Sequence, residues 1–564
     1  MDTISVTVGR SRQASSSRLL PPLTYLILTL VFWGRFVLER GLHAETVWIE
    51  LSQLHPGWEG FLYPYDSSRR FMSVPFHAAY LLSNGSYLPL HLIFGLFVFL
   101  TGWLTWMLVK RLFPNAPLLA FIAGSLALIH GADLSTNTTP MIVVRQSVVA
   151  LLGAAVCFRI GWEWRRLWLL VPAALLQALS LWTYEPGLLL LAAIPTIIWN
   201  GRRDFHRWLA WTAAWSVVPA LFVASLVQRY LVEGTSSYQS AKLASQFDPI
   251  VAATGLPKLL YRGVAFWAWP IPWYRTQMQG CAGDVWSRIA PALLAGTALF
   301  AVLALLLRKQ SSSDRSVPWT KALTLATICV ALAYVPFLAL GDVGAWRTQF
   351  YAAPPAAILL ALAFTGLDAI AVARGRLAVL LATAVAASGM FVGLVSQLDM
   401  SYRWRIHRLV MDGIVREAPR LRDDTLVVLS NVPTGFPYAV CDNAAPVDPF
   451  LDTFWFNSAL RVLYPGAKIA GVYWRSDLSS PGAIEYQFDE SGARLRRSNT
   501  ITTPDRVPYD RIVAFHYDQR SGSHLMEQFP AGEIPGSRAS GSYAPRARIL
   551  PGPPPAETRN RLSQ

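Results

Sequence analysis

The stretch LPLHLIFGLFVFLTGWLTWMLVKR, residues 88–111, decides the fold class of this chain. Between Leu88 and Val109 it holds no acidic residue, lysine or arginine, and it is long enough for a helix to cross the roughly 30 Å of hydrocarbon in a bilayer. Lys110 and Arg111 follow at once. An apolar helix that ends in basic residues is typical of a membrane span whose basic end faces the cytoplasm.

The composition of the whole chain supports the same prediction. Of the 564 residues, 53 % are hydrophobic, which is more than a soluble domain can bury. Because backbone polar groups find no water inside a bilayer, the apolar runs of the first 400 positions are expected to be helices. We predict about eleven spans, at residues 20–38, 88–109, 116–130, 141–158, 167–183, 187–199, 208–231, 288–307, 320–340, 351–372 and 377–397.

Arginine and lysine side chains occur in every second connection between these spans, which is the pattern of cytoplasmic loops. The amino terminus is therefore predicted to be cytoplasmic, and everything after residue 400 to lie outside. The net charge of +15 follows from this topology, so no nucleic-acid partner is needed to explain it. Residues 257–275 are also apolar, but counting them as a span would reverse the alternation, so we interpret them as a non-spanning segment on the outer face.

Basic residues are mostly arginine, and alanine and leucine are abundant, as expected for a GC-rich bacterial genome. The predicted location is therefore the bacterial inner membrane, with a periplasmic outer side. We divide the chain into a cytoplasmic tail (1–19), a transmembrane domain (20–400) with long outer loops at 39–87 and 232–287, and a periplasmic domain (401–528). Short β-strand patterns and one amphipathic helix make that last domain a small α/β unit. Residues 529–564, rich in Pro, Gly, Ser and Arg, are predicted to be disordered.

Several common catalytic motifs are absent from the sequence. It has no phosphate-binding G-x-x-x-x-G-K-[ST], no H-E-x-x-H, no paired C-x-x-C and no G-x-S-x-G. ATP-driven transport, zinc hydrolysis and serine-esterase chemistry therefore have no support in the sequence. No metal-binding motif is present, so the sequence does not identify a cofactor. The use of a divalent cation is left open.

The first outer loop carries most of the candidate catalytic residues. A carboxylate at the membrane face, Asp66 or Glu45, can deprotonate an incoming hydroxyl group. The neighbouring Arg69 and Arg70 can hold a phosphate through paired hydrogen bonds, and His77 follows them. The alternative is a solvated loop that ends in a helix lying on the membrane surface.

Two short outer turns carry further candidates. Glu185 lies beside Tyr184 in SLWTYEPG, where it can bind a sugar hydroxyl or serve only to complement the dipole of the helix that follows. Arg347, next to Trp346 in GDVGAWRTQFY, can clamp a lipid phosphate or be an ordinary arginine of an interfacial aromatic belt.

The order of these features resembles the GT-C class of integral membrane glycosyltransferases. The resemblance rests on AETVWIE (44–50), RRFMSVPFH (69–77) and TYEPGLLLLAAIP (183–195), with a soluble domain after the last span. It implies that the protein transfers a sugar from a polyprenyl-phosphate donor by an inverting mechanism. The implied acceptor is a periplasmic glycan, lipid or protein, and membrane lipids surround the protein. The resemblance also implies an acidic catalytic residue near Glu45, which makes Glu45 the rival of Asp66, the residue that we predict to be the catalytic base.

Two other functions remain open from the sequence. A polymerase or ligase of surface polysaccharide would use similar lipid-linked substrates. A flippase or transporter of lipid-linked sugars would need charged residues buried in the middle of its spans, and these spans hold few.

The predicted orientation can be tested with reporter fusions. Alkaline phosphatase joined after residue 420 should be active, because that position is predicted to be periplasmic, and the same enzyme joined after residue 200 should be inactive. The control is a reporter that is active only in the cytoplasm, which should be inactive after residue 420 and active after residue 200. An inactive phosphatase at 420 would contradict the orientation.

Overall fold

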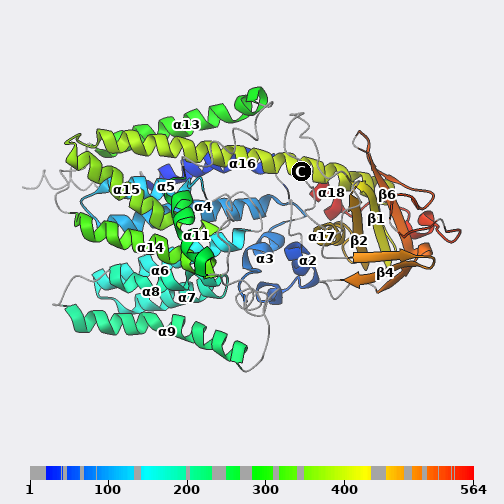
Figure 1. The fold of residues 1–564 in the computed structure, drawn as a ribbon, viewed down its shortest axis with the longest axis horizontal. Coiled ribbons are helices and arrows are strands. Elements are labelled where there is room, and N and C mark those ends of the chain that lie inside the picture. The colour runs from blue at the N-terminus through cyan, green and yellow to red at the C-terminus, as the bar shows by residue number, and fades with distance from the viewer. Residues whose placement is uncertain are drawn as a thin grey trace, which may run out of the picture.

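The computed structural model describes a helical bundle joined to a smaller domain that contains all the described strands (Figure 1). The described residues are 21–39, 41, 47–63, 69–83, 85–132, 141–197, 204–231, 249–266, 282–308, 317–339, 348–432, 453–475, 485–497, 505–518, 520–534, 536–538 and 540–563.

Eight described helices are long and apolar enough to cross a membrane. They are Pro21–Glu39, which ends in the 3-10 helix η1 (Gly34–Glu39), α4 (Leu88–Leu112), α6 (Ile142–Trp164), α9 (Phe205–Leu231), α13 (Ala282–Arg308), α14 (Trp319–Ala339), α15 (Ala353–Ile370) and the first part of α16 (Arg376–Glu417). They indicate a multi-pass membrane protein, as the sequence predicted.

The prediction of about eleven spans is not confirmed. Three of the expected spans are short apolar helices in the described structure: α5 (Pro117–Leu128), α7 (Leu170–Leu181), preceded by η5 (Leu167–Leu169), and α8 (Leu188–Ile197). At a rise of 1.5 Å per residue, helices of this length reach only about half to two-thirds of the way across the hydrocarbon. The aromatic segment at 257–275 begins within another helix, α11 (Pro249–Val264), and its residues after 266 lie outside the described part of the chain.

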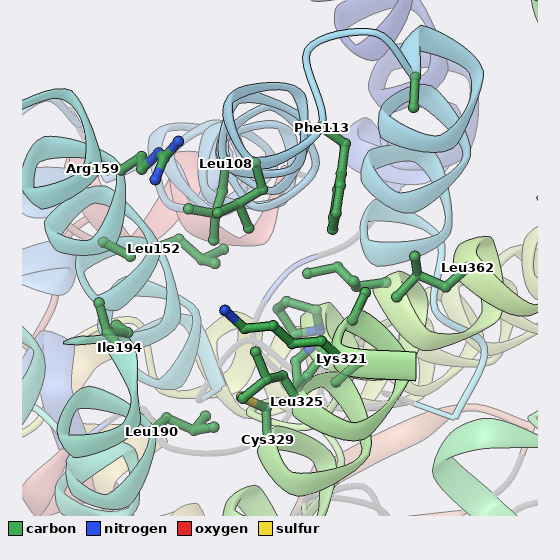
Figure 2. Close-up of a pocket in the computed structure, with 18 of the residues that line it drawn as sticks. Leu108, Phe113, Leu152, Arg159, Leu190, Ile194, Lys321, Leu325, Cys329 and Leu362 are labelled. Atoms are coloured by element: carbon green, nitrogen blue, oxygen red, sulfur yellow. The ribbon is translucent and has the colours of Figure 1, made fainter. Parts of the chain in front are cut away.

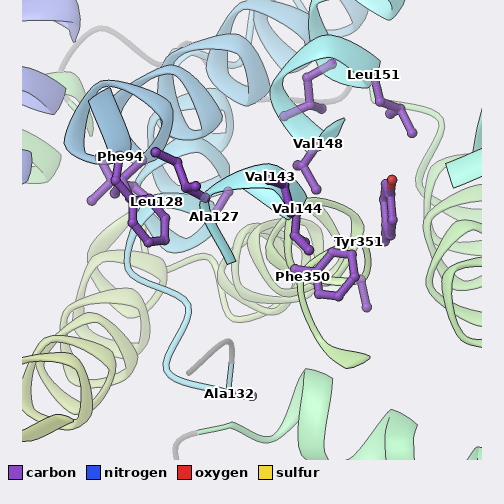
Figure 3. Close-up of a cluster of buried hydrophobic side chains, with 14 of the residues drawn as sticks. Phe94, Ala127, Leu128, Ala132, Val143, Val144, Val148, Leu151, Phe350 and Tyr351 are labelled. Carbon is purple, nitrogen blue, oxygen red and sulfur yellow. The ribbon is translucent and has the colours of Figure 1, made fainter. Parts of the chain in front are cut away.

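Small residues allow α4 and α5 to pack with their backbones close together. A Cβ atom on Gly102 would lie 3.0 Å from the backbone oxygen of Gly124, and one on Gly124 would lie 2.7 Å from that of Gly102. Helices in a bilayer associate mainly through such close packing. Figure 3 shows the adjoining apolar core, which includes Phe94, Leu128, Val143, Val148, Phe350 and Tyr351.

Helix α16 joins the bundle to the second domain without a break. Its 42 residues extend for about 63 Å at the usual helical rise. Residues Arg376–Leu398 form the membrane-length part, and Val410, Met411 and Ile414 pack in the core of the second domain. The sequence placed a domain boundary near residue 400, whereas one continuous helix crosses that position.

The second domain is built on a sheet of order β2-β1-β6-β7. Strand β1 (Thr425–Val432) runs parallel to β2 (Ile469–Arg475) and β6 (Ile512–Asp518), while β7 (Gly522–Leu525) is antiparallel to β6. Helix α17 (Thr453–Leu463) connects β1 to β2. A second sheet contains β3 (Glu485–Asp489), β4 (Gly492–Arg497) and β5 (Arg506–Pro508). The described part of this domain therefore combines strands with a helix, α17, as the sequence predicted for a small α/β unit.

Parts of the first outer loop lie between the bundle and this domain. They are α2 (Val47–Leu54), η2 (Trp58–Phe61) and α3 (Val74–Leu81), and α2 packs against α17 (Figure 1). The side-chain amide of Gln53 donates to the backbone oxygen of Val462 and to the Glu557 carboxylate. We call this end of the bundle the domain end, and the opposite end, where α4 meets α5, the distal end.

The expected disorder after Gln528 is contradicted by the described residues of that segment. They include η10 (Pro545–Arg548) and end in helix α18 (Ala556–Leu562), which contacts both α16 and α17. Thr558 is fully buried and donates to the backbone oxygen of Leu463. Composition suggested a solvated tail, but specific contacts with the folded domain compensate for the low hydrophobicity.

Arg561 shows how firmly α18 is held. Its side chain is 2 % exposed, forms an ion pair with Glu557 and lies 5.7 Å from the ring centre of Tyr87, which immediately precedes α4. One buried guanidinium thus joins the C-terminal helix to the first residues of a membrane span.

Arg561→Ala should lower the free energy of unfolding by about 2–3 kcal/mol, because it removes a buried hydrogen-bonding group and leaves Glu557 without its charged partner. Thermal unfolding in detergent measures the effect. Arg559→Ala is the matched control, since Arg559 is exposed on the same helix. Equal melting temperatures for the two variants would contradict the role given to Arg561.

Candidate functional site

The candidate site lies at the domain end of the bundle, where the first outer loop meets the turn between α7 and α8. The backbone N–H of Phe71 donates to the oxygen of Trp182 at 3.2 Å, which holds the loop against the turn. The 3-10 helix η6 (Glu185–Gly187) forms this turn, with Tyr184 extended just before it. Segments more than a hundred residues apart in the sequence thereby form one site.

The central contact of the site is an ion pair between Arg69 and Glu185. Nε of Arg69 donates to Oε1 of Glu185 at 3.0 Å, and Nη2 donates to Oε2 at 3.1 Å. The two side chains are 14 % and 20 % exposed. The guanidinium also lies over the Tyr184 ring, 4.5 Å from its centre. Two parallel hydrogen bonds and a stacking surface fix the plane of the arginine.

A buried polar network supports this pair from within the bundle. Gln146, on α6, donates to the backbone oxygen of Phe71 at 3.0 Å and to the Thr183 hydroxyl at 2.9 Å. The Tyr351 hydroxyl donates to the backbone oxygen of Tyr184 at 2.9 Å and forms a short hydrogen bond with Ser147. The loop, the turn, α6 and the segment just before α15 are therefore joined by hydrogen bonds.

Sequence reasoning missed these supporting residues. The signal that could have found them is the pair Gln146–Ser147 within the apolar run of α6, because polar side chains inside a membrane helix are costly unless they have partners. Ser180, near the end of α7, completes the network through hydrogen bonds with Ser147. These residues hold the site and need not touch a substrate.

The structure brings together three of the predicted site residues: Arg69, Tyr184 and Glu185. Arg70 is exposed and forms no ion pair with a described residue. Asp66 and Glu45, the two candidate bases, lie outside the described residues, as do Trp346 and Arg347. Their predicted roles stay predictions. Among the described residues, no group of three or more histidine, cysteine and acidic side chains could hold a metal ion.

His77, the remaining polar candidate of the loop, has a structural position. Its Nε2 lies 2.8 Å from the backbone oxygen of Gly57, to which it can donate, and its ring packs edge-on against Phe61. Burial lowers the pKa of His77 below its usual 6.5, partly opposed by the hydrogen bond to Gly57 and by the charge of Glu59. The ring is neutral at pH 7 and fastens the middle of the loop to α3.

Protein-family models, curated proteins and solved structures were all compared with this chain, and none matches it.

The lowered pKa of His77 predicts that the loop loosens in acid. Below pH 6.5, His77 binds a proton more readily when the loop is unfolded than when it is folded. The stability of the folded loop should therefore fall as the pH drops from 6.5 towards the lowered pKa of His77. Hydrogen exchange at residues 57–63, corrected for intrinsic rates, should show faster opening at pH 5.5 than at pH 7. His77→Gln keeps a donor but does not titrate, so it should abolish the change. The same pH dependence in that variant would assign the effect to another group.

Proposed function

We propose that this protein is a glycosyltransferase that moves a sugar from a polyprenyl-phosphate donor to an acceptor outside the membrane, by an inverting reaction. The observation that carries the proposal is the Arg69–Glu185 pair stacked on Tyr184, at one end of a bundle of apolar helices. A lipid-linked donor has its phosphate and sugar at the membrane surface and its chain in the hydrocarbon. A polar site at the end of apolar helices can therefore bind the phosphate and sugar while the chain stays in the hydrocarbon.

Arg69 is proposed to bind the donor phosphate. Phosphate recognition by arginine depends on the orientation of the planar guanidinium. Because Glu185 and Tyr184 already hold that plane, little conformational freedom would be lost when the phosphate binds. In the reaction this cation would stabilise the negative charge that grows on the departing phosphate.

The Tyr184 ring and the Glu185 carboxylate are proposed to contribute to the sugar site. Aromatic rings offer apolar faces to the C–H groups of a sugar, and carboxylates accept hydrogen bonds from its hydroxyls. Glu185 has two oxygens, each with more than one acceptor position, so pairing with Arg69 does not exhaust its capacity. The site would thus hold phosphate and sugar on adjacent residues.

The catalytic base is proposed to be Asp66, which precedes Arg69 by three residues, with Glu45 as the alternative. The acceptor hydroxyl oxygen attacks the anomeric carbon of the donor sugar, and its proton passes to the carboxylate. The bond between that carbon and the phosphate oxygen breaks, and its electron pair leaves with the polyprenyl phosphate. One attack from the opposite face inverts the configuration.

The C-terminal domain is proposed to help receive the acceptor. It packs on α2 of the loop that carries Arg69, through α17 and the Gln53 hydrogen bonds. In the orientation predicted from the basic connections, this domain and the site face the periplasm of a bacterial inner membrane.

The donor and the acceptor are first identified by comparing the lipid-linked sugars and envelope glycans of a deletion strain with those of the wild type. Transfer of a labelled sugar from that polyprenyl-phosphate donor then tests the proposal. Asp66→Asn should reduce the rate roughly 10²–10⁴-fold if it is the base, and Glu45→Gln, assayed beside it, tests the rival. Arg69→Lys should mainly weaken donor binding, because lysine keeps the charge but loses the planar fork.

The matched control is Arg546→Lys, which alters an ion pair with Glu527 on the surface of the C-terminal domain. It should leave transfer unchanged. Full activity in both carboxylate variants and in Arg69→Lys would refute the proposed site. Unchanged lipid-linked sugars and glycans in the deletion strain would refute the function.

A further inference from the structure

A second feature of the bundle opens at the end opposite to the proposed catalytic site, and its inner wall reaches Tyr351, which supports the turn at Tyr184. A cavity of about 320 Å³ opens between α6 and α8 on one side and α14 and α15 on the other, and it reaches the α4–α5 connection (Figure 2). Its walls are almost entirely apolar and include Leu108, Leu152, Leu190, Ile194, Leu325 and Leu362. Such walls favour an apolar ligand over water.

Polar lining is concentrated at the distal end of this cavity. Asn115 lies in the α4–α5 connection, Arg159 near the end of α6 and Lys321 near the start of α14. Figure 2 shows Arg159 and Lys321 on opposite sides of the cavity. The remaining polar groups of the lining are Tyr351 and Cys329, deeper in the bundle.

Among the described residues that line this opening, the charged side chains are basic. Arg159 and Arg111 share one carboxylate, that of Glu163, at 2.8 and 2.6 Å. Lys321 adds a third cation, from the exposed start of α14. Counted over these described side chains, three cations and one carboxylate lie at or next to the opening of the apolar cavity, and no acidic residue is among the described residues that line it.

We propose that this cavity binds an anionic phospholipid of the leaflet at the distal end, with one acyl chain inside and the phosphate between Lys321 and Arg159. Charge complementarity selects the headgroup, since basic residues at the membrane surface attract anionic lipids. The apolar walls select the chain. The Arg69–Glu185 pair lies at the other end of the bundle, so this lipid is distinct from the proposed sugar donor and the inference does not depend on the proposed function.

Binding can be measured on the purified full-length protein by native mass spectrometry, with phosphatidylglycerol and phosphatidylcholine of identical chains as probes. Phosphatidylglycerol should bind about tenfold more tightly, because only it carries a net negative charge. Lys321→Glu should remove most of this preference. Arg376→Glu is the matched control, because Arg376 is an exposed cation at the same end but does not line the cavity.

Cys329 gives an independent readout because its side chain lines the cavity. Phosphatidylglycerol should slow labelling of Cys329 by an apolar maleimide, quantified by peptide mass spectrometry, in the wild-type protein but far less in Lys321→Glu. Unchanged thermal unfolding would show that this exposed substitution leaves the fold intact. Equal binding of the two phospholipids, equal loss in Arg376→Glu, or unprotected Cys329 would overturn the proposal. Displacement of phosphatidylglycerol by a polyprenyl phosphate at lower concentration would also overturn it, by assigning the cavity to that lipid.

Discussion

Backbone N–H and C=O groups cannot be left without hydrogen-bond partners inside a bilayer, and this constraint underlies the architecture of the whole chain. It turns the apolar runs into helices and limits which polar side chains they can carry. The side-chain hydroxyls of Thr29, Thr101 and Thr105 find a hydrogen-bond acceptor within their own helix, because each donates to the backbone oxygen four residues earlier. Asp368 accepts from the N–H groups of Leu377 and Ala378 and so satisfies the start of α16.

The same constraint moves strongly polar chemistry to the two ends of the bundle. At the domain end, Arg69 and Glu185 pair beside Tyr184, above the hydrogen bonds of Gln146 and Ser147. At the distal end, cations surround the opening of an apolar cavity. We therefore propose different ligands for the two ends: a phosphate with a sugar at one, and an anionic headgroup with an acyl chain at the other. Tyr351 belongs to both regions, since it lines the cavity and supports the turn at Tyr184.

Among the described residues, three contacts join the C-terminal domain to the bundle and its first outer loop, so a single hinge would not move it freely. Helix α16 is continuous, α17 packs on α2, and α18 inserts Arg561 beside Tyr87. Two of these contacts involve the loop that leads to Arg69 or the start of the following span. Motion of the domain would therefore be transmitted to the candidate site, so the domain has a physical route to influence that site.

Local patterns in the sequence determined the membrane class, the positions of the long helices and the strands of the last domain. Hydropathy and alternation act over a few neighbouring residues, so they can be interpreted without knowledge of the fold. The sequence patterns also indicated Arg69, Tyr184 and Glu185 as candidates, but Arg69 was expected to bind a phosphate, and Glu185, beside Tyr184, a sugar hydroxyl. Only the tertiary structure joined Arg69 to Glu185, because the two are 116 residues apart and no local pattern encodes that pairing. For the same reason, the polar pair Gln146–Ser147 in α6 indicated a need for partners but did not identify them, and Tyr351 is a partner that only the structure shows. The cavity and the ordered C-terminal helix could not be predicted either, because both depend on contacts between distant segments.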